Sequence, residues 1–340
     1  MRRRAFHAYL GLGLGALLAG SADIPVPSKL IKPRRLKRGD VIGLITPGSY
    51  ISDTALEKAV SNLETLGFRV KLGQNIRARH GFVAGTDEQR LSDLHDMFSD
   101  QGVAGIWCAR GGYGCSRLLP MLDYKLIKRH AKVLIGYSDI TALIQAIHQQ
   151  TGLVGFHGPV AASDMTDYTA HYFSEVVMEG RAPLVISRPG VSAADETNPS
   201  FVIREGQCRG VLAGGNLSLL AALSGTPYAL DATNKLLFVE EVGEAPYRID
   251  RMLTQLRQSS GIEAASGLAF GIFSDCEATD PESSLSLRQT LEGQIAGLGI
   301  PSDYGHQIGH IADLCTLPVG IMASLDTRSR QITLLESGVV

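Results

Sequence analysis

Ser138 stands where a serine hydroxyl can act as a nucleophile. It follows the apolar run Lys132–Gly136, which predicts a buried strand, and precedes the helical pattern Ile140–His148. A serine on such a turn is exposed at the sheet edge, and the helix N-terminus behind it favours developing negative charge. The position equally suits a helix N-cap. The glycine that a full nucleophile elbow places two residues after the serine is replaced by Ile140, so both interpretations stay open.

A glycine-rich segment, Arg110-Gly111-Gly112-Tyr113-Gly114, follows a second predicted strand, Gly105–Ala109. Glycines let backbone N–H groups approach a ligand closely, so the segment could bind phosphate or supply an oxyanion donor. It lacks the Gly-Lys-Ser/Thr ending of a P-loop and the last glycine of a dinucleotide fingerprint. A tight turn without a ligand remains the alternative.

Three carboxylates, Glu240, Glu241 and Glu244, lie at or after the end of the apolar run Lys235–Glu240. A carboxylate that emerges from a buried strand is costly unless it is paired. Glu240 continues the strand directly, so it is the best placed of the three to orient a histidine. A solvated strand end, or pairing with arginines such as Arg248, is the alternative.

His310 and His306 lie in a glycine-flanked segment near the C-terminus. The pair also suits a metal site, but no His-Glu-x-x-His motif or cysteine cluster accompanies it. Serine, glutamate and histidine follow one another along the chain, each beside a strand end or a glycine turn. A nucleophilic serine needs a base, and the base needs an orienting carboxylate, so these residues indicate a serine hydrolase.

The bulk composition is that of a globular protein of one large or two ordinary domains. The chain has 340 residues, 44% of them hydrophobic and 19% charged, and a formal net charge of −2. No basic stripe indicates nucleic-acid binding. The five cysteines include no Cys-x-x-Cys pair, and their surroundings favour small buried hydrophobes over disulfides.

Residues 1–22 have the layout of an export signal. Met1–Phe6 is basic, Tyr9–Ala19 is apolar, and Gly20-Ser21-Ala22 offers small residues for cleavage. The pair Arg3-Arg4 resembles a twin-arginine signal, which predicts a periplasmic location. A short N-terminal membrane anchor is the alternative, although the apolar run is short for a span. No later segment is long and apolar enough to cross a membrane.

The remaining chain predicts an α/β fold. Residues 37–163 alternate strands with helices, which implies a flavodoxin-like parallel sheet with helices on both faces. The glycine clusters fall at the carboxyl ends of its strands, where ligands bind in such sheets. Residues 164–205 show a weak pattern and are interpreted as a linker or crossover. Residues 206–335 predict a smaller C-terminal α/β domain, with a helix over Glu282–Leu298.

Several motifs together resemble the serine LD-carboxypeptidases, also called muramoyl-tetrapeptide carboxypeptidases. The resemblance runs from about Lys37 to the C-terminus. Each motif is weak alone, and their common order is specific. They are Gly39-Asp40-Val41-Ile42-Gly43, Pro47-Gly48-Ser49, Arg110-Gly111-Gly112-Tyr113-Gly114, Gly136-Tyr137-Ser138-Asp139-Ile140-Thr141, Phe156-His157-Gly158-Pro159, Gly214-Gly215-Asn216-Leu217, Glu240-Glu241-Val242-Gly243-Glu244-Ala245-Pro246-Tyr247-Arg248 and Gly309-His310.

The resemblance implies a Ser138–Glu240–His310 triad, with the backbone N–H groups of Gly112 and Asp139 as the oxyanion hole. It implies hydrolysis of the bond that joins the L-centre of diaminopimelate or lysine to the terminal D-alanine of murein tetrapeptide. It also implies a homodimer and no metal or other cofactor. Many family members act in the cytoplasm, so the apparent export signal is a departure that leaves a cytoplasmic location as an alternative.

The substrate carboxylate needs cationic partners, for which Arg110 and Arg248 are the candidates. Two other functions remain open on the same fold. One is an amide hydrolase like the microcin C immunity enzymes, which would share the triad. The other is a muropeptide-binding protein without catalytic activity. A metal-dependent carboxypeptidase that uses His306 and His310 is a third alternative.

Overall fold

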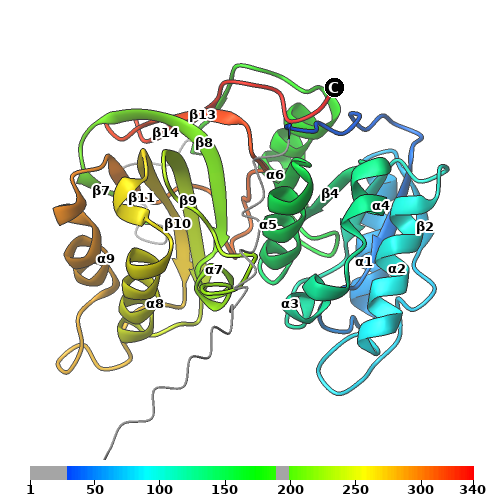
Figure 1. Cartoon of the computed structure of the whole chain (residues 1–340), viewed down its shortest axis with the longest axis horizontal. Helices are drawn as coiled ribbons and strands as arrows, with labels where there is room; N and C mark the ends of the chain where they lie inside the picture. Colours follow the sequence, from blue (N-terminus) through cyan, green and yellow to red (C-terminus); the bar gives the residue numbers. More distant parts are fainter. Residues whose placement is uncertain (1–28, 189–198) are drawn as a thin grey trace, which may run out of the picture.

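The computed structural model describes residues 29–188 and 199–340, which form two α/β halves, each built on its own β-sheet (Figure 1). The predicted export signal, residues 1–22, lies outside the described residues. Among the helices of the described chain, none is both long and apolar enough to cross a membrane. All five cysteines are free thiols.

The first sheet has the strand order β12-β5-β4-β3-β1-β2, in which β1 to β5 are parallel and β12 is antiparallel to β5. The order 2-1-3-4-5 is that of flavodoxin-like sheets, so the predicted fold class is confirmed. The elements of this half are β1 Val41–Ile45, α1 Asp53–Thr65, β2 Arg69–Leu72, α2 Asp87–Ser99, β3 Gly105–Cys108, α3 Cys115–Leu118, α4 Tyr124–Arg129, β4 Val133–Gly136, α5 Ile140–Thr151, β5 Gly155–His157 and α6 Asp167–Phe173.

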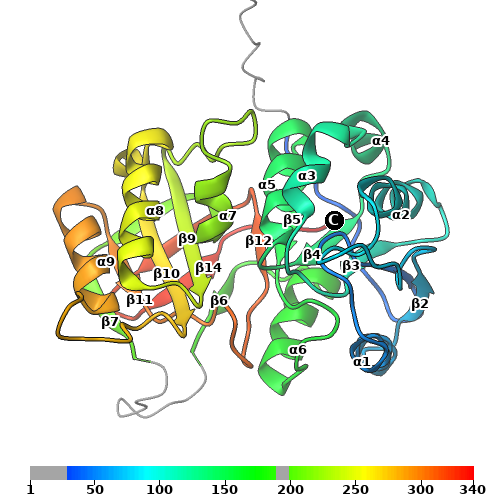
Figure 2. The same cartoon turned by 90° about the horizontal axis from the view of Figure 1, so that it is seen from below.

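Helices cover both faces of this sheet. Figure 2 shows α1 and α6 on one side, and α2, α3, α4 and α5 on the other. Local signals start the helices at defined residues: Ser52 accepts from the N–H of Ala55 at the start of α1, and Thr86 forms a capping box with Gln89 at the start of α2. Strands β3 and β4 are buried on both sides, which explains their continuous apolar runs.

The second sheet is mixed, with the order β6-β14-β13-β8-β9-β10-β11-β7. Its central strands β8 to β11 are parallel, and α7, α8 and α9 contribute apolar side chains to a second core against them. The elements are β6 Leu184–Ile186, β7 Phe201–Arg204, β8 Gln207–Asn216, α7 Leu217–Ala222, β9 Lys235–Val242, α8 Pro246–Ser259, β10 Gly267–Ser274, α9 Leu287–Ile295, β11 Ser302–Tyr304, β12 Leu317–Val319, β13 Met322–Asp326 and β14 Gln331–Leu334.

The predicted helix Glu282–Leu298 is too long. Helix α9 begins at Leu287, because Ser286 accepts from the N–H of Gln289 and the Gln289 side chain accepts from the N–H of Ser286. This capping box fixes the helix start five residues after Glu282, the first residue of the predicted helix.

Two predicted boundaries need correction. The segment 164–205 is not a plain linker, because it holds α6 and the edge strands β6 and β7. Strand β12 lies within the predicted C-terminal domain 206–335 but pairs with β5 of the first sheet. The last residue also returns to the first half, where the carbonyl of Val340 accepts from the N–H of Arg35.

Candidate active site

Ser138 lies on the turn between β4 and α5 in a strained backbone conformation. Its φ is 63°, in the left-handed region that residues other than glycine rarely occupy. Such a residue costs on the order of 1–3 kcal/mol and clusters at functional sites. The helix-cap interpretation is wrong: Asp139 occupies the N-cap position of α5, without a side-chain cap, and Ser138 contributes only its carbonyl, which accepts from the N–H of Thr141. The Ser138 hydroxyl is therefore not committed to the helix.

The glycine segment after β3 packs directly against this serine. A Cβ added to Gly111 would lie 3.2 Å from Ser138 Oγ, and one added to Gly112 would lie 2.3 Å from Ser49 Oγ. Gly112 has a φ of 98°, so any side chain there would be strained as well as obstructed. The two glycines are required because the backbone must approach Ser138 and Ser49 at van der Waals distance.

Two backbone donors flank the serine. Within residues 29–188 and 199–340, the N–H groups of Gly112 and Asp139 have no hydrogen-bond acceptor. The N–H of Asp139 belongs to the residue directly after Ser138. The N–H of Gly112 belongs to the residue after Gly111, which packs against Ser138. Free N–H groups beside a nucleophile are the donors that an oxyanion hole requires.

The Asp139 side chain has a structural role next to this turn. Its Oδ2 accepts from the backbone N–H of Cys115 at 2.9 Å, which joins the start of α3 to the start of α5. The carboxyl group is 2% exposed, and burial raises its pKa while the hydrogen bond from Cys115 opposes that rise. The side chain therefore fixes the glycine loop to the Ser138 turn.

Glu240 and His310 form a hydrogen bond from strand β9 to the loop that follows β11. His310 Nδ1 and Glu240 Oε2 are 2.9 Å apart, and the Glu240 side chain is fully buried while the His310 side chain is 23% exposed. A carboxylate can only accept, so Nδ1 carries the hydrogen and leaves Nε2 free to take a proton. A glycine is required at position 309, because its φ is 131° and an added Cβ would lie 2.6 Å from the carbonyl oxygen of Ile272.

His310 lies beside the Ser138 turn. The ring of Tyr137, the residue before Ser138, has its centroid 4.8 Å from that of His310. The first sheet thus supplies the serine, and the second sheet supplies the histidine and the carboxylate. The combination of a serine, a histidine and a buried carboxylate is that of a nucleophile, its base and an orienting group.

The other two carboxylates of the predicted cluster have different partners. Glu241 accepts from Asn216 Nδ2 at 3.2 Å and from the N–H of Ser218 at 2.8 Å, which stabilises the start of α7. Glu244 pairs with Arg248 at 3.2 Å. Burial raises the pKa of Glu241, and its hydrogen bonds oppose that rise. Of the three, Glu240 is the one that contacts a histidine in the described chain.

His306 and His310 do not share a site. His306 Nε2 is 2.8 Å from Asp303 Oδ1, and both side chains are almost completely buried. In the described part of the chain, no group of three or more histidine, cysteine, aspartate or glutamate residues has the arrangement of a metal site. The metal interpretation of this histidine pair therefore has no geometric support.

The two candidate arginines lie in different surroundings. Arg110 donates from Nη1 to the carbonyl of Tyr50 at 2.9 Å and, with Ser49, Gly81 and Phe82, lines a hollow of about 350 Å³ next to the glycine segment. Arg248 lies on α8, where it pairs with Glu244 and stacks on the Tyr247 ring.

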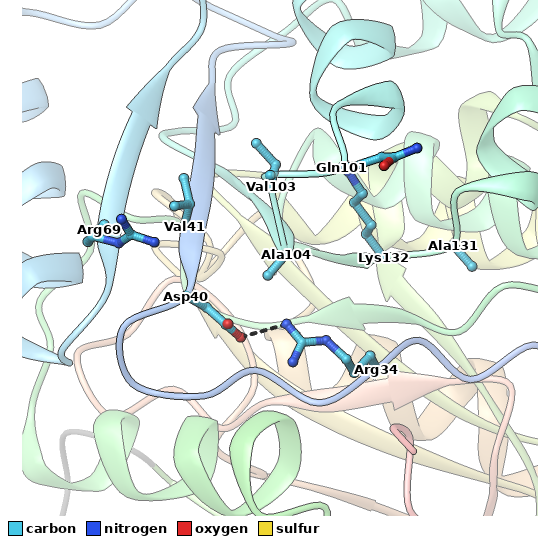
Figure 3. A pocket seen from close by; sticks show the side chains of 10 residues that line it. Arg34, Asp40, Val41, Arg69, Gln101, Val103, Ala104, Ala131 and Lys132 are labelled. Atoms are coloured by element: carbon cyan, nitrogen blue, oxygen red, sulfur yellow. Dashed lines mark hydrogen bonds and ion pairs between the residues drawn. The ribbon is translucent and has the colours of Figure 1, made fainter.

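A second hollow of about 350 Å³ lies where the strands of the first sheet begin, at the edge opposite to the Ser138 turn (Figure 3). Arg34 and Asp40 form an ion pair of 3.0 Å there. Lys132 donates to the carbonyl of Met97 at 2.9 Å, and burial lowers the pKa of its ammonium group to about 8. These cations have protein partners, and the hollow is separate from the serine site.

The sequence motifs included two residues to which no role was assigned, Tyr137 and His157. Tyr137 packs on His310, and His157 is 1% exposed with its ring 6.1 Å from that of Tyr137. Burial lowers the pKa of the His157 imidazole to about 4. The His157 motif Phe156-His157-Gly158-Pro159 was visible in the sequence, but only the fold places its imidazole beside the site.

Two family models match this chain: the LD-carboxypeptidase N-terminal domain over residues 42–158 and the LD-carboxypeptidase C-terminal domain over residues 209–325. A Bacillus subtilis protein named "Probable murein peptide carboxypeptidase" is 40% identical over 91% of this chain and 95% of its own. The "Murein tetrapeptide carboxypeptidase" of Pseudomonas aeruginosa is 35% identical over 84% of this chain and 92% of its own.

Solved structures agree in fold. The muramoyltetrapeptide carboxypeptidase of Oxalobacter formigenes superposes with a TM-score of 0.74 at 31% identity and covers 86% of this chain and 97% of its own. The microcin C7 self-immunity protein MccF superposes with a TM-score of 0.82 at 23% identity and covers 91% of this chain and all of its own.

Proposed function

This chain belongs to the LD-carboxypeptidase family, and we propose on that basis that it removes the terminal D-alanine from murein tetrapeptide by serine catalysis. The observation that carries the proposal is the hydrogen bond from His310 to the buried Glu240 carboxylate, beside the strained Ser138 turn. The names of the relatives support the murein peptide as the substrate class.

In the proposed mechanism, His310 Nε2 takes the proton from Ser138 Oγ as this oxygen attacks the scissile carbonyl carbon. Glu240 holds the imidazole with Nδ1–H toward Oε2 and stabilises the imidazolium that forms. The imidazolium then protonates the leaving amine, and D-alanine departs from the tetrahedral intermediate, which leaves the acyl-enzyme. His310 next removes a proton from the water that attacks the acyl carbon, and it returns this proton to Ser138 Oγ as the bond between Oγ and the acyl carbon breaks.

The oxyanion hole is proposed to consist of the N–H groups of Gly112 and Asp139. Both donors are free within the described chain. The hydrogen bond from Cys115 to the Asp139 carboxylate and the close packing of Gly111 on Ser138 fix their positions before the substrate arrives. Each donor of this kind is typically worth about 10²–10³ in rate.

Arg110 is proposed to bind the carboxylate of the terminal D-alanine. It precedes Gly111, which packs against Ser138 so closely that a Cβ would lie 3.2 Å from Ser138 Oγ, and it lines the hollow next to the glycine segment. A carboxypeptidase cuts the bond before the terminal residue, so the group that binds the substrate carboxylate must lie close to the nucleophile. Arg248 has its charge balanced by Glu244, so we propose a smaller role for it.

A related activity on an aminoacyl-nucleotide amide is the second candidate, because the MccF fold superposes over the whole of that chain. The triad would be shared, so only the substrate separates the two functions. Turnover of the nucleotide amide at a higher kcat/KM than that of murein tetrapeptide would favour the second candidate.

We further propose that residues 1–22 direct export by the twin-arginine route to the periplasm, and that the chain acts as a homodimer. The support for export is the basic, apolar and small-residue layout of that segment. Sedimentation equilibrium of the mature chain tests the dimer, which a monomer at micromolar concentration would contradict.

The first prediction concerns the nucleophile. Ser138→Ala is expected to lower the release of D-alanine from murein tetrapeptide at least about 10³-fold, because the acyl-enzyme cannot form. Release is measured by coupled oxidation of free D-alanine. Ser61→Ala, an exposed serine on α1, is the matched control and is expected to retain native activity. Native-level release by Ser138→Ala excludes the serine mechanism, and binding without release by the native chain indicates a binding protein.

The second prediction concerns the substrate carboxylate. Arg110→Gln is expected to lower kcat/KM roughly 10–100-fold, mainly through KM, because a charge-assisted hydrogen bond is lost. Arg248→Gln is expected to change it less than about threefold, as for an exposed ion pair. Steady-state kinetics on tetrapeptide and on its C-terminal amide measure both. The assignment fails if the loss is the same on the amide, which has no carboxylate.

The third prediction concerns export. Replacement of Arg3 and Arg4 by lysine is expected to move the protein from the periplasmic to the cytoplasmic fraction, because the twin-arginine route reads this pair. Immunoblotting of fractionated cells measures the distribution. An unchanged periplasmic fraction would rule out the twin-arginine route, and a native chain found only in the cytoplasm would rule out export.

A further inference from the structure

The carboxylate of the proposed triad is only half satisfied by protein groups. Glu240 is fully buried, and its Oε2 accepts from His310. Its Oε1 is inaccessible and has no donor among the described residues. A buried carboxylate oxygen without a donor is costly, and such atoms in native proteins normally bind ordered water or another polar group. Glu240 Oε1 therefore needs a hydrogen-bond donor other than His310.

A buried imidazole with two unpartnered nitrogens lies next to this carboxylate. His157, the last residue of β5, is 1% exposed, and neither Nδ1 nor Nε2 has a hydrogen-bond partner within the described chain. Burial keeps the imidazole neutral at neutral pH. A neutral imidazole carries one N–H donor and one acceptor, so His157 has the donor that Glu240 Oε1 lacks.

Ring contacts place His157 beside the Glu240–His310 pair. Its ring centroid is 5.1 Å from that of Phe238, which is two residues before Glu240 on β9 and so on the same face of the strand. It is also 6.1 Å from the Tyr137 ring, which in turn packs on His310. His157 and Glu240 come from different sheets and meet at the junction of the two halves.

We propose that His157 is a positioning residue for Glu240, acting through one buried water that accepts from an imidazole N–H and donates to Glu240 Oε1. A buried water needs at least two polar partners, and these two groups provide them. Glu240 is then held at both oxygens, by His310 directly and by His157 through water. The inference rests on the proposed function, because the positioned carboxylate is the one that orients the base.

Loss of the His157 donor is expected to change the protonation of His310, because His310 pairs with the charged Glu240. The titratable groups around the Glu240–His310 pair are Glu240 and Glu241 on β9, Tyr137 before α5, His157 on β5, and Asp164.

Loss of the donor at Glu240 Oε1 concentrates the negative charge at Oε2, which stabilises the protonated form of the His310 ring. The protonation of His310 then occurs at higher pH, and less of the base is available.

The test compares His157→Phe, which keeps a ring but has no donor, with His157→Gln, which keeps an N–H donor. NMR titration of the ¹⁵N-labelled His310 ring measures the effect without any substrate. The midpoint is expected to rise by about 0.5–1 pH unit in His157→Phe and to stay near the native value in His157→Gln. If thermal unfolding shows that His157→Phe does not fold normally, His157→Met replaces it in the comparison, because methionine also lacks a donor.

Kinetics on tetrapeptide provide the second readout. His157→Phe is expected to lower kcat about 10-fold with KM within about twofold, and to move the acid limb of kcat/KM to higher pH. A role in packing alone predicts equal losses in the Phe and Gln variants and an unmoved titration, and that result overturns the inference. Failure of the native chain to release D-alanine overturns the proposed function and leaves the titration test intact.

Discussion

The site depends on one interaction, the hydrogen bond between the buried Glu240 and the partly exposed His310. A fully buried carboxylate is unfavourable unless donors satisfy it, so β9 can carry Glu240 only if His310 reaches it. The loop that carries His310 needs a glycine at position 309, where φ is 131° and a Cβ would meet the carbonyl of Ile272. The hydrogen bond to Glu240 fixes the tautomer of His310 and leaves Nε2 as the acceptor. The same hydrogen bond thus satisfies the buried carboxylate and orients the proposed catalytic base.

The two halves of the molecule must be held together for this pair to serve Ser138. Strand β12 pairs with β5, although its neighbours along the chain, β11 and β13, belong to the second sheet. It follows the His310 loop by a few residues, so the segment that carries the base is anchored in the first sheet. Tyr137, which packs on His310, completes the contact beside the serine. Separation of the halves would separate the nucleophile from its base.

The sequence predicted the parts of the site that depend on local pattern. Ser138, the glycine segment 110–114 and Glu240 were identified because each lies at or after the end of a predicted apolar strand, whereas the role of Gly112 itself was implied by the family resemblance. The left-handed backbone of Ser138 and the Asp139 N-cap were not predictable, since they arise from packing of the glycine segment. The role of His157 was missed because it depends on contacts between two sheets.

For the fold as well, the features that depend on local pattern were predicted, and those that depend on distant contacts were not. The parallel sheet over residues 37–163 was predicted because its strands are apolar and alternate with amphipathic helices. The edge strands β6 and β7 were not predicted, because they lie in a stretch rich in proline, serine, threonine and alanine. The exchange of β12 between sheets was not predicted, because it depends on pairing with a distant strand. What the sequence lacked was long-range pairing, which is also what joins Glu240 and His310 across 70 residues.

The central claim is that Glu240 activates Ser138 through His310, and covalent trapping tests it most directly. A fluorophosphonate is allowed to react with the native chain and with Glu240→Gln, and intact mass and peptide mapping give the rate and the modified residue. The account predicts a single adduct on Ser138 that forms at least about 10²-fold more slowly in the variant, because the amide cannot fix the required tautomer. Equal rates in the two proteins, or an adduct on another residue, would contradict it.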